Sequence, residues 1–324
     1  MKTFESFLTP SLEEYLAYRQ TLGYVDENMR SCLRSFDRYV KDKAGAPQPL
    51  TSLFFLAMRK ELPGEARTVN AVLSAARGFF QFLVRCERCP ENPLQDIPPR
   101  AENGYIPYIF APNEIEQLLR AIRHRLRRDR QYFLKDLTAY MAVLLLARCG
   151  LRISEPLRLL RNHYRPDEKS LYIKETKFAK DRLIPLPAQT ATEIDNYLAV
   201  RQALQPADTN PFLLPGRIDK PFSANRLYPL FHQAVNDIGP AKPRRIIAGL
   251  TFGAPTPHCL RHSFAVNTLK RIKERGESPQ RALPVLSSYL GHRKYRYTAV
   301  YLKVIDAKQR QGLVDFAISH QEEL

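Results

Sequence analysis

The chain has 324 residues, of which 44% are hydrophobic, and its formal net charge at pH 7 is +17. This length suffices for two domains with separate cores, and the hydrophobic content excludes a wholly disordered protein. The positive charge favours a polyanionic partner, either nucleic acid or an acidic membrane face.

No apolar stretch reaches the roughly 18 residues of a membrane-spanning helix, and the N-terminal region carries acidic residues where a signal peptide needs an apolar segment. The five cysteines are an odd number, which favours a reducing cytoplasm over a disulfide framework. Cys86 and Cys89 form one CxxC pair without a second pair or a nearby pair of histidines, so we predict no metal site. We expect a cytoplasmic protein that has no membrane partner.

Residues 1–89 are predicted to form a compact domain of four helices. Apolar residues recur at three- and four-residue steps along three long stretches of this region. Gly23 and Gly45 stand where helices should end, and prolines separate the stretches. Residues 90–107 contain five prolines and show no helical period, which predicts an extended linker because proline withholds a hydrogen-bond donor.

Residues 108–324 are predicted to form a second domain that is mainly α-helical with a small β-sheet. Within it, residues 170–187 have two short runs rich in Leu, Ile and Tyr around a basic turn, which is the pattern of a β-hairpin. Six arginines crowd into residues 120–130. They form either a solvated helix face or a surface that follows phosphates, and the second interpretation assigns nucleic-acid contacts to Arg123, Arg127 and Arg128.

The first of three candidate site motifs is CGLRISE, which ends at Glu155. It places Arg152 in a turn between two helices, where the planar guanidinium can meet a phosphate through paired hydrogen bonds. The alternative is a structural pair between Arg152 and Glu155. The second motif is PHCLRHSF, which puts His258 and Arg261 three residues apart on one helix face, so that one phosphate can receive both side chains.

The third motif is YLGH, which ends at His292 and is followed by the basic run RKYRY. Tyrosine can serve as a nucleophile, and four tyrosines of this region compete for that role: Tyr289, Tyr295, Tyr297 and Tyr301. A lysine at the tip of the predicted hairpin can donate a proton to a leaving oxygen, and the candidates are Lys174, Lys177 and Lys180.

In their order, these motifs resemble those of the tyrosine recombinases, the phage integrase family. The resemblance is strong over residues 105–310 and loose over the first hundred residues. It selects Tyr301 as the nucleophile, because the family's nucleophile follows the histidine of the third motif by the same interval. It also selects Lys177 as the catalytic lysine and places Glu155 behind the site as a supporting acid. His262 lies outside the family's catalytic pattern and is predicted to be structural.

The resemblance implies a site-specific DNA recombinase that cleaves and rejoins DNA through a 3′-phosphotyrosyl intermediate. The implied catalytic residues are Arg152, Lys177, His258, Arg261, His292 and Tyr301. In this scheme Arg152, Arg261 and His292 stabilise the negative charge of the phosphate as preorganised donors. His258 takes the tyrosine's proton, and Lys177 protonates the departing 5′-oxygen. Neither ATP nor a metal cofactor is then required, in keeping with a sequence that contains no GxxxxGK[ST] loop.

The same resemblance implies a fold and an assembly. It predicts an N-terminal helical core-binding domain of the SAM-like type, followed by a C-terminal tyrosine-recombinase catalytic domain. The partner is double-stranded DNA, with accessory DNA-binding proteins also compatible, and the location is the nucleoid of the cytoplasm. A synaptic homotetramer would form by exchange of a C-terminal helix, whose apolar residues are Leu313, Val314, Phe316 and Ile318. Packing of this helix within its own chain is the alternative.

The sequence departs from compact members of the family at two places. The stretches before His258 and before Gly291 are longer, and we interpret them as surface additions that contact DNA or a neighbouring molecule. Further predicted DNA contacts are Arg182, just after the hairpin turn, and Arg293 and Lys294, just after His292. The sequences ALPVLSSYLGH and YLKV resemble those of the family branch that transposons and integrative elements carry.

Two other functions share this chemistry or fold. A type IB topoisomerase would relax supercoiled DNA by the same reaction without synapsis, but the helical N-terminal region resembles the recombinase core-binding domain instead. A non-catalytic DNA-binding regulator on a decayed recombinase fold is the other alternative. The intact set of catalytic residue types speaks against it.

Overall fold

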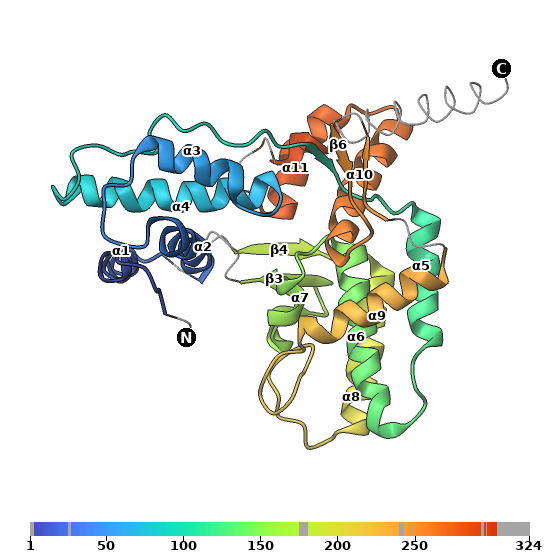
Figure 1. The fold of residues 1–324 in the computed structure, drawn as a ribbon. Helices are drawn as coiled ribbons and strands as arrows, with labels where there is room; N and C mark the ends of the chain where they lie inside the picture. The colour runs from blue at the N-terminus through green and yellow to red at the C-terminus, as the bar shows by residue number, and fades with distance from the viewer. Residues whose placement is uncertain are drawn as a thin grey trace. The chain divides into compact units, whose positions relative to one another are not determined.

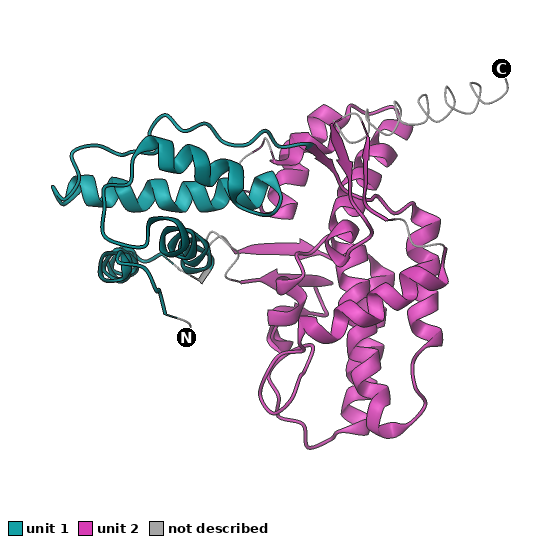
Figure 2. Cartoon of the chain, in the orientation of Figure 1, with its two compact units in different colours: residues 1–103 teal, residues 104–324 magenta. Residues whose placement is uncertain are grey.

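The computed structural model describes residues 3–24, 27–174, 181–239, 243–247, 249–292, 295 and 297–302. The chain divides into two compact units, residues 1–103 and residues 104–324 (Figure 2). The described residues are mainly helical and carry two three-stranded sheets, which confirms the predicted fold class. In this part of the chain, no helix combines the length and the apolar character needed to cross a membrane.

The described residues of unit 1 form four helices: α1 (Thr9–Thr21), α2 (Glu27–Ala44), α3 (Ser52–Glu61) and α4 (Ala66–Arg85). Its core is aromatic, and the rings of Phe36, Phe55, Phe79 and Phe80 have centroids 5.3–6.3 Å apart. Such rings bury large apolar areas and explain why a small helical unit is compact.

The proline-rich segment packs largely against unit 1. Leu94 and Ile97 are buried in the core of that unit, and the Arg77 guanidinium donates to both of their carbonyl oxygens at 3.0 and 2.7 Å. The division between the units falls after Asn103, within the predicted linker at residues 90–107. The chain is therefore fixed to unit 1 over much of the stretch that lacks a helical period.

Unit 2 contains the helices α5 (Pro112–His124), α6 (Arg130–Cys149), α7 (Ser154–Arg158), α8 (Ala188–Leu204), α9 (Ala224–Asp237), α10 (Pro257–Glu274) and α11 (Pro279–Leu290) (Figure 1). The nearly all-apolar α6 is the buried centre, and it packs against α5, α8, α9 and α10. Residues 138–149 of α6 are buried nearly throughout, as expected for an apolar stretch that other helices cover.

The first sheet of unit 2 contains the predicted hairpin. Its strands are β2 (Tyr164–Arg165), β3 (Ser170–Ile173) and β4 (Arg182–Pro185), in the antiparallel order β2–β3–β4. Leu171 and Ile184 are paired and fully buried, so one face of the two strands packs on the core, whereas Leu183 on the other face is exposed. The turn between β3 and β4, with Lys177, lies outside the described residues.

The second sheet joins β1 (Gly104–Ile106), β5 (Arg245–Ile247) and β6 (Leu250–Phe252). β1 and β6 are parallel, and β5 and β6 form an antiparallel hairpin. This hairpin lies in the longer stretch that precedes His258, and Ile246 and Ile247 on β5 are exposed. The surface addition predicted there thus includes a strand pair whose outer strand presents apolar side chains.

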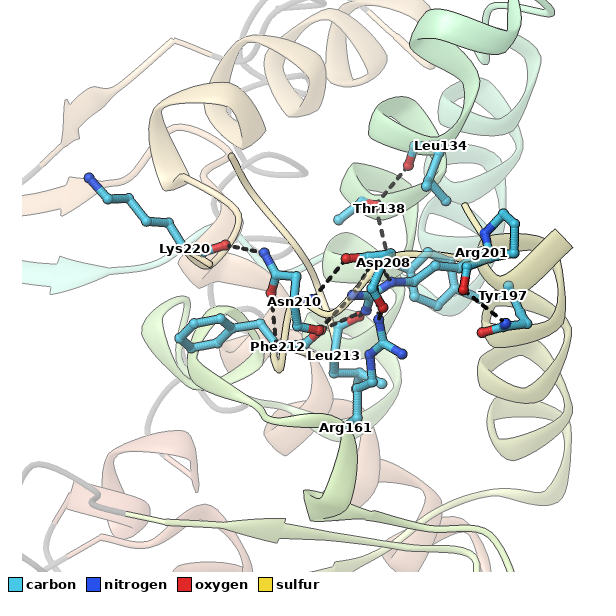
Figure 3. A network of polar contacts seen from close by, with 12 residues as sticks. Leu134, Thr138, Arg161, Tyr197, Arg201, Asp208, Asn210, Phe212, Leu213 and Lys220 are labelled. Atoms are coloured by element: carbon cyan, nitrogen blue, oxygen red, sulfur yellow. Dashed lines mark hydrogen bonds and ion pairs between the residues drawn. The ribbon is translucent and has the colours of Figure 1, made fainter. Parts of the chain in front are cut away.

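A buried polar network fixes the long segment that follows α8 (Figure 3). The Arg201 guanidinium, only 2% exposed, donates to the Asp208 carboxylate and to the carbonyl oxygens of Asn210 and Phe212, at 2.6–2.9 Å. Arg161 also contacts Asp208, and its backbone N–H donates to the Pro211 carbonyl. A charge buried with this many partners stabilises one arrangement of the segment that lies beside the α7–β2 connection.

Candidate active site

Arg152 is held in the turn between α6 and α7. Gly150 ends α6 in the left-handed conformation, at φ +57°, and a Cβ there would lie 2.5 Å from a ring carbon of Phe264, so glycine suits the position on both grounds. The Arg152 guanidinium donates to Glu155 Oε1 and to the Gly291 carbonyl oxygen, each at 2.7 Å. Its position is thus defined by both α7 and the end of α11.

Glu155 joins two arginines beneath the site. It accepts from the backbone N–H and guanidinium of Arg152, and from both terminal nitrogens of Arg182 at 3.1 and 2.8 Å. Burial raises the pKa of Glu155, but the hydrogen bonds and charge of Arg182 outweigh it, and the net shift is downward. This carboxylate therefore stays ionised and orients Arg152.

Arg182 lies within this cluster and not on an open surface. Its side chain is 10% exposed, and besides Glu155 it donates through Nε to the Tyr289 carbonyl at 2.9 Å. Its partners make Arg182 a residue that holds Glu155 and the end of α11 in place. The direct DNA contact that the sequence predicts for Arg182 stays a prediction.

Arg261 on α10 connects the ends of two other helices. It is 2% exposed and donates to the Gly150 carbonyl at 2.8 Å and to the Leu290 carbonyl at 2.6 Å. Those oxygens stand at the C-terminal ends of α6 and α11, where helices favour positive charge. Burial, helped by the charge of Arg152, lowers the pKa of Arg261 to about 10, which leaves it protonated at neutral pH.

His292 and Tyr301 complete the site from the chain that follows α11. His292 Nδ1 lies 2.8 Å from Thr298 Oγ1, and its ring stacks on that of Tyr301 with centroids 6.2 Å apart. Tyr301 is 3% exposed, whereas Tyr297 is 48% exposed. Of these two tyrosines, Tyr301 is the one enclosed with the arginines. Burial raises its pKa, and the charges of Arg261 and Arg152 oppose that rise.

The structure thus gathers most of the implied catalytic residues at the ends of α6, α10 and α11. The gathered residues are Arg152, His258, Arg261, His292 and Tyr301. Lys177, Arg293 and Lys294 lie outside the described residues. Within the ranges that are described, His, Cys, Asp and Glu side chains form no group of three or more that could hold a metal ion.

His262 is the residue of this site that sequence reasoning assigned to a structural role. Its Nδ1 lies 3.2 Å from the Tyr301 hydroxyl, and its ring packs against His258 with centroids 4.6 Å apart. His258 and His262 are four residues apart, which places them on the same face of α10. This spacing is the sequence signal that indicates a place for His262 in the site, because a residue one helical turn after His258 faces the same side of α10.

Three of the six arginines at residues 120–130 are paired with acidic side chains: Arg123, Arg125 and Arg127. Arg123 is bonded to the Tyr140 hydroxyl and to Glu193, and Arg127 is bonded through two nitrogens to Asp136. Arg127 and Arg128 precede α6, while Arg152 follows it. Twenty helical residues span about 30 Å, so the two groups are separated by the length of that helix. These contacts favour the interpretation as a solvated surface.

Two partly buried histidines, His262 and His292, predict a loss of stability in mild acid. Burial and neighbouring positive charges lower the pKa of His262 to about 3 and that of His292 to about 4. The unfolded chain binds these protons near pH 6.5, whereas the folded protein does not, so stability is complete above pH 6.5 and falls as the pH drops towards 4. Between pH 7 and pH 5 we expect a loss on the order of 1 kcal/mol per histidine in urea unfolding. His262→Gln should reduce this slope, and a free energy of unfolding that is constant over the range would contradict the prediction.

The chain is similar to known proteins in sequence and in fold. The model of the phage integrase family matches residues 109–308. A putative integrase/recombinase of Sinorhizobium fredii, y4rE, is 32% identical over 93% of each chain. Two solved structures share the fold: a lambda integrase tetramer bound to a Holliday junction, and the Tn1549 transposon integrase in complex with a circular-intermediate DNA. The lambda integrase is 15% identical, with a TM-score of 0.66, and the match covers 91% of this chain and 76% of the lambda integrase chain. The Tn1549 integrase is 18% identical, with a TM-score of 0.63, and the match covers 93% of this chain and 99% of the Tn1549 integrase chain. The chain therefore belongs to the phage integrase family, the tyrosine recombinases.

Proposed function

We propose that this chain is a site-specific DNA recombinase that cleaves and rejoins double-stranded DNA through a 3′-phosphotyrosyl intermediate. The observation that carries the proposal is the enclosure of the Tyr301 side chain beside Arg261, His262 and His292, on segments that are distant in sequence. A buried phenol surrounded by cationic and imidazole groups is suited to attack a phosphodiester and is unusual as a purely structural arrangement.

Arg152 and Arg261 are the proposed phosphate ligands, together with His292. Both guanidiniums are oriented before DNA arrives, Arg152 by Glu155 and Arg261 by helix-end carbonyls. Donors that are already in place stabilise the charge of the transition state without a cost of reorganisation. Arginine also supplies paired donors that match phosphate oxygens, which lysine does not.

In the reaction, the Tyr301 oxygen bonds to phosphorus, and the bond from phosphorus to the 5′-oxygen breaks. A histidine of α10 takes the phenol proton, with His258 the one implied by the resemblance, and Lys177 delivers a proton to the 5′-oxygen. The phosphotyrosine retains the energy of the broken bond, and attack by a second 5′-hydroxyl reverses the step. This scheme consumes no ATP and routes no step through a metal.

Assembly into a synaptic tetramer by exchange of the C-terminal segment is part of the proposal. A groove of about 790 Å³ between α10 and α11 is lined by Phe264, Thr268, Ile272, Val285 and Tyr289, among others. Its apolar lining suits the apolar set of the C-terminal segment, Leu313, Val314, Phe316 and Ile318. The structure of a lambda integrase tetramer bound to a Holliday junction is a precedent for a tetramer on DNA.

Deleting residues 306–324 should therefore spare DNA binding and weaken synapsis. We expect single-site affinity within about threefold of the full chain, because the proposed phosphate ligands precede the deletion. Formation of paired complexes should fall at least tenfold in a two-site gel assay. Val285→Glu, in the groove, is the matched variant and should reproduce the defect. Undiminished recombination by the truncated protein would show that the segment packs within its own chain.

The proposed function is tested with a nicked half-site in EDTA and without ATP. The protein should become covalently attached to the 3′ end of the DNA, and two intact sites should recombine. A non-catalytic regulator binds DNA without forming the adduct, and a type IB topoisomerase relaxes a plasmid that carries no site pair.

We place the protein on DNA in the nucleoid, and we assign it to a mobile element, in line with its likeness to the transposon integrase.

A further inference from the structure

His262 is the imidazole in direct contact with the nucleophilic oxygen. Its Nδ1 lies 3.2 Å from the Tyr301 hydroxyl, within hydrogen-bonding distance, and the two rings are 5.6 Å apart in an edge-on arrangement. His258, the proton acceptor implied by the family resemblance, is exposed and packs against the His262 ring.

We propose that His262 is a catalytic residue, which holds the Tyr301 hydroxyl through Nδ1 and accepts its proton as the bond to phosphorus forms. The inference rests on the proposed function, since it requires Tyr301 to be the nucleophile. The proton leaves the phenol oxygen for His262 Nδ1 while that oxygen bonds to phosphorus, and the 5′-oxygen leaves with a proton from Lys177. The reverse step returns the proton from His262 to Tyr301, so no proton is gained or lost over the cycle.

The surroundings of His262 suit an acceptor that is neutral before DNA binds. The groups that face it are His258 and Arg261 on α10, and His292 and Tyr301 after α11. Burial and the three cationic or imidazole neighbours hold the pKa of His262 at about 3, so the ring is neutral at pH 7. A neutral ring with its hydrogen on Nε2 presents a lone pair at Nδ1, the atom that lies nearest the hydroxyl.

Binding of DNA should raise the pKa of His262. A phosphodiester seated on Arg152 and Arg261 brings a negative charge next to the groups that disfavour protonation of His262. That charge offsets Arg261, so His262 becomes more basic when the substrate is in place. Proton transfer from Tyr301 is thereby favoured in the complex and disfavoured in the free protein.

The test is the rate of adduct formation under single-turnover conditions between pH 7 and pH 9, on saturating DNA. The substrate carries sulfur at the 5′-bridging position, so that departure of the leaving group does not limit the rate. We expect a nearly flat profile for the full-length wild type. For His262→Ala we expect the rate of adduct formation at pH 7 to be about 100-fold below that of the wild type. This difference should shrink by about tenfold per pH unit as the pH rises, because hydroxide replaces the missing proton acceptor.

Two further variants separate proton transfer from packing. The Oδ1 atom of His262→Asn takes the place of Nδ1 and can accept the hydroxyl's hydrogen bond without its basicity, so this variant should be faster than His262→Ala and equally dependent on pH. Lys177→Ala should be fast on the sulfur substrate, which shows that the His262 defect lies on the nucleophile's side of the reaction. DNA affinity, measured in parallel, should be unchanged in all three variants.

Three results would overturn the inference while leaving the proposed function intact. The first is a wild-type rate of adduct formation in His262→Ala. The second is a rate in His262→Ala that is reduced by the same factor at every pH. The third is a rate that rises with hydroxide concentration in His258→Ala and not in His262→Ala. A variant that misfolds and binds DNA poorly forms the adduct more slowly than the wild type by the same factor at every pH. That result counts against the inference as well. Absence of the adduct with wild-type protein would overturn the proposed function and this inference together.

Discussion

We expect Tyr301→Phe to abolish the covalent adduct and to leave DNA affinity nearly unchanged. The substitution removes only the hydroxyl, and the ring still fills the buried space beside His262 and His292. Without the nucleophilic oxygen, adduct formation on a nicked half-site should fall by about 10⁴-fold or more. The measurement is retention of end-labelled DNA on the protein after denaturation in detergent, beside a binding isotherm for the same variant.

Tyr297→Phe is the matched control for this experiment. Tyr297 is four residues away and also lies near the His292 ring, at 6.4 Å between centroids, but its side chain is half exposed. We expect its adduct rate to remain within about threefold of wild type, as is usual for a surface substitution away from the reacting atoms. If Tyr301→Phe still forms the adduct and Tyr297→Phe does not, the nucleophile is Tyr297.

We expect Lys177→Ala to stop cleavage for a different reason, and we expect a change in the substrate to reverse the defect. The 5′-oxygen is a poor leaving group without a proton, so removal of the acid should slow cleavage by about 10²- to 10⁴-fold. Sulfur at the bridging position leaves readily as a thiolate and needs no acid. The sulfur substrate should therefore restore cleavage to Lys177→Ala and not to Tyr301→Phe, in the same adduct assay.

The neighbouring lysines provide the control. Lys174→Ala and Lys180→Ala should cleave the ordinary substrate at rates close to wild type, since the family pattern selects Lys177 among the three. If sulfur rescues neither Lys177→Ala nor the other two, the proton comes from elsewhere. If it rescues Lys180→Ala alone, the hairpin is aligned wrongly by three residues.

The parts of the fold that could be predicted are those with a strong local signal. The helices of unit 1 and the strands β3 and β4 follow from apolar spacing, which depends on a few consecutive residues. The sheet of β1, β5 and β6 could not be predicted, because strands of three residues are too short to show alternation. The pairing of Gly104 with Leu250 also joins segments that no local pattern connects.

The candidate site shows the same limit in its side chains. Residue types and family spacing predicted that Arg152, Arg261, His292 and Tyr301 would gather, and they do. The partners of a long side chain depend on tertiary contacts, however. Residue type and spacing alone do not predict that Arg182 bonds to Glu155, or that His262 contacts the Tyr301 hydroxyl.

The end of α11 also affects how the site tolerates mutation. Arg152 donates to the carbonyl of Gly291, Arg261 to that of Leu290, and Arg182 to that of Tyr289. Main-chain oxygens are present whatever the side chain, so a substitution at these positions cannot delete the acceptors. Only a shift of the backbone can, and Gly291, at φ +64° with Arg182 packed against it, resists any side chain that would cause one. The orientation of three arginines is thus insensitive to most single substitutions in this turn, but sensitive to an insertion or deletion of one residue.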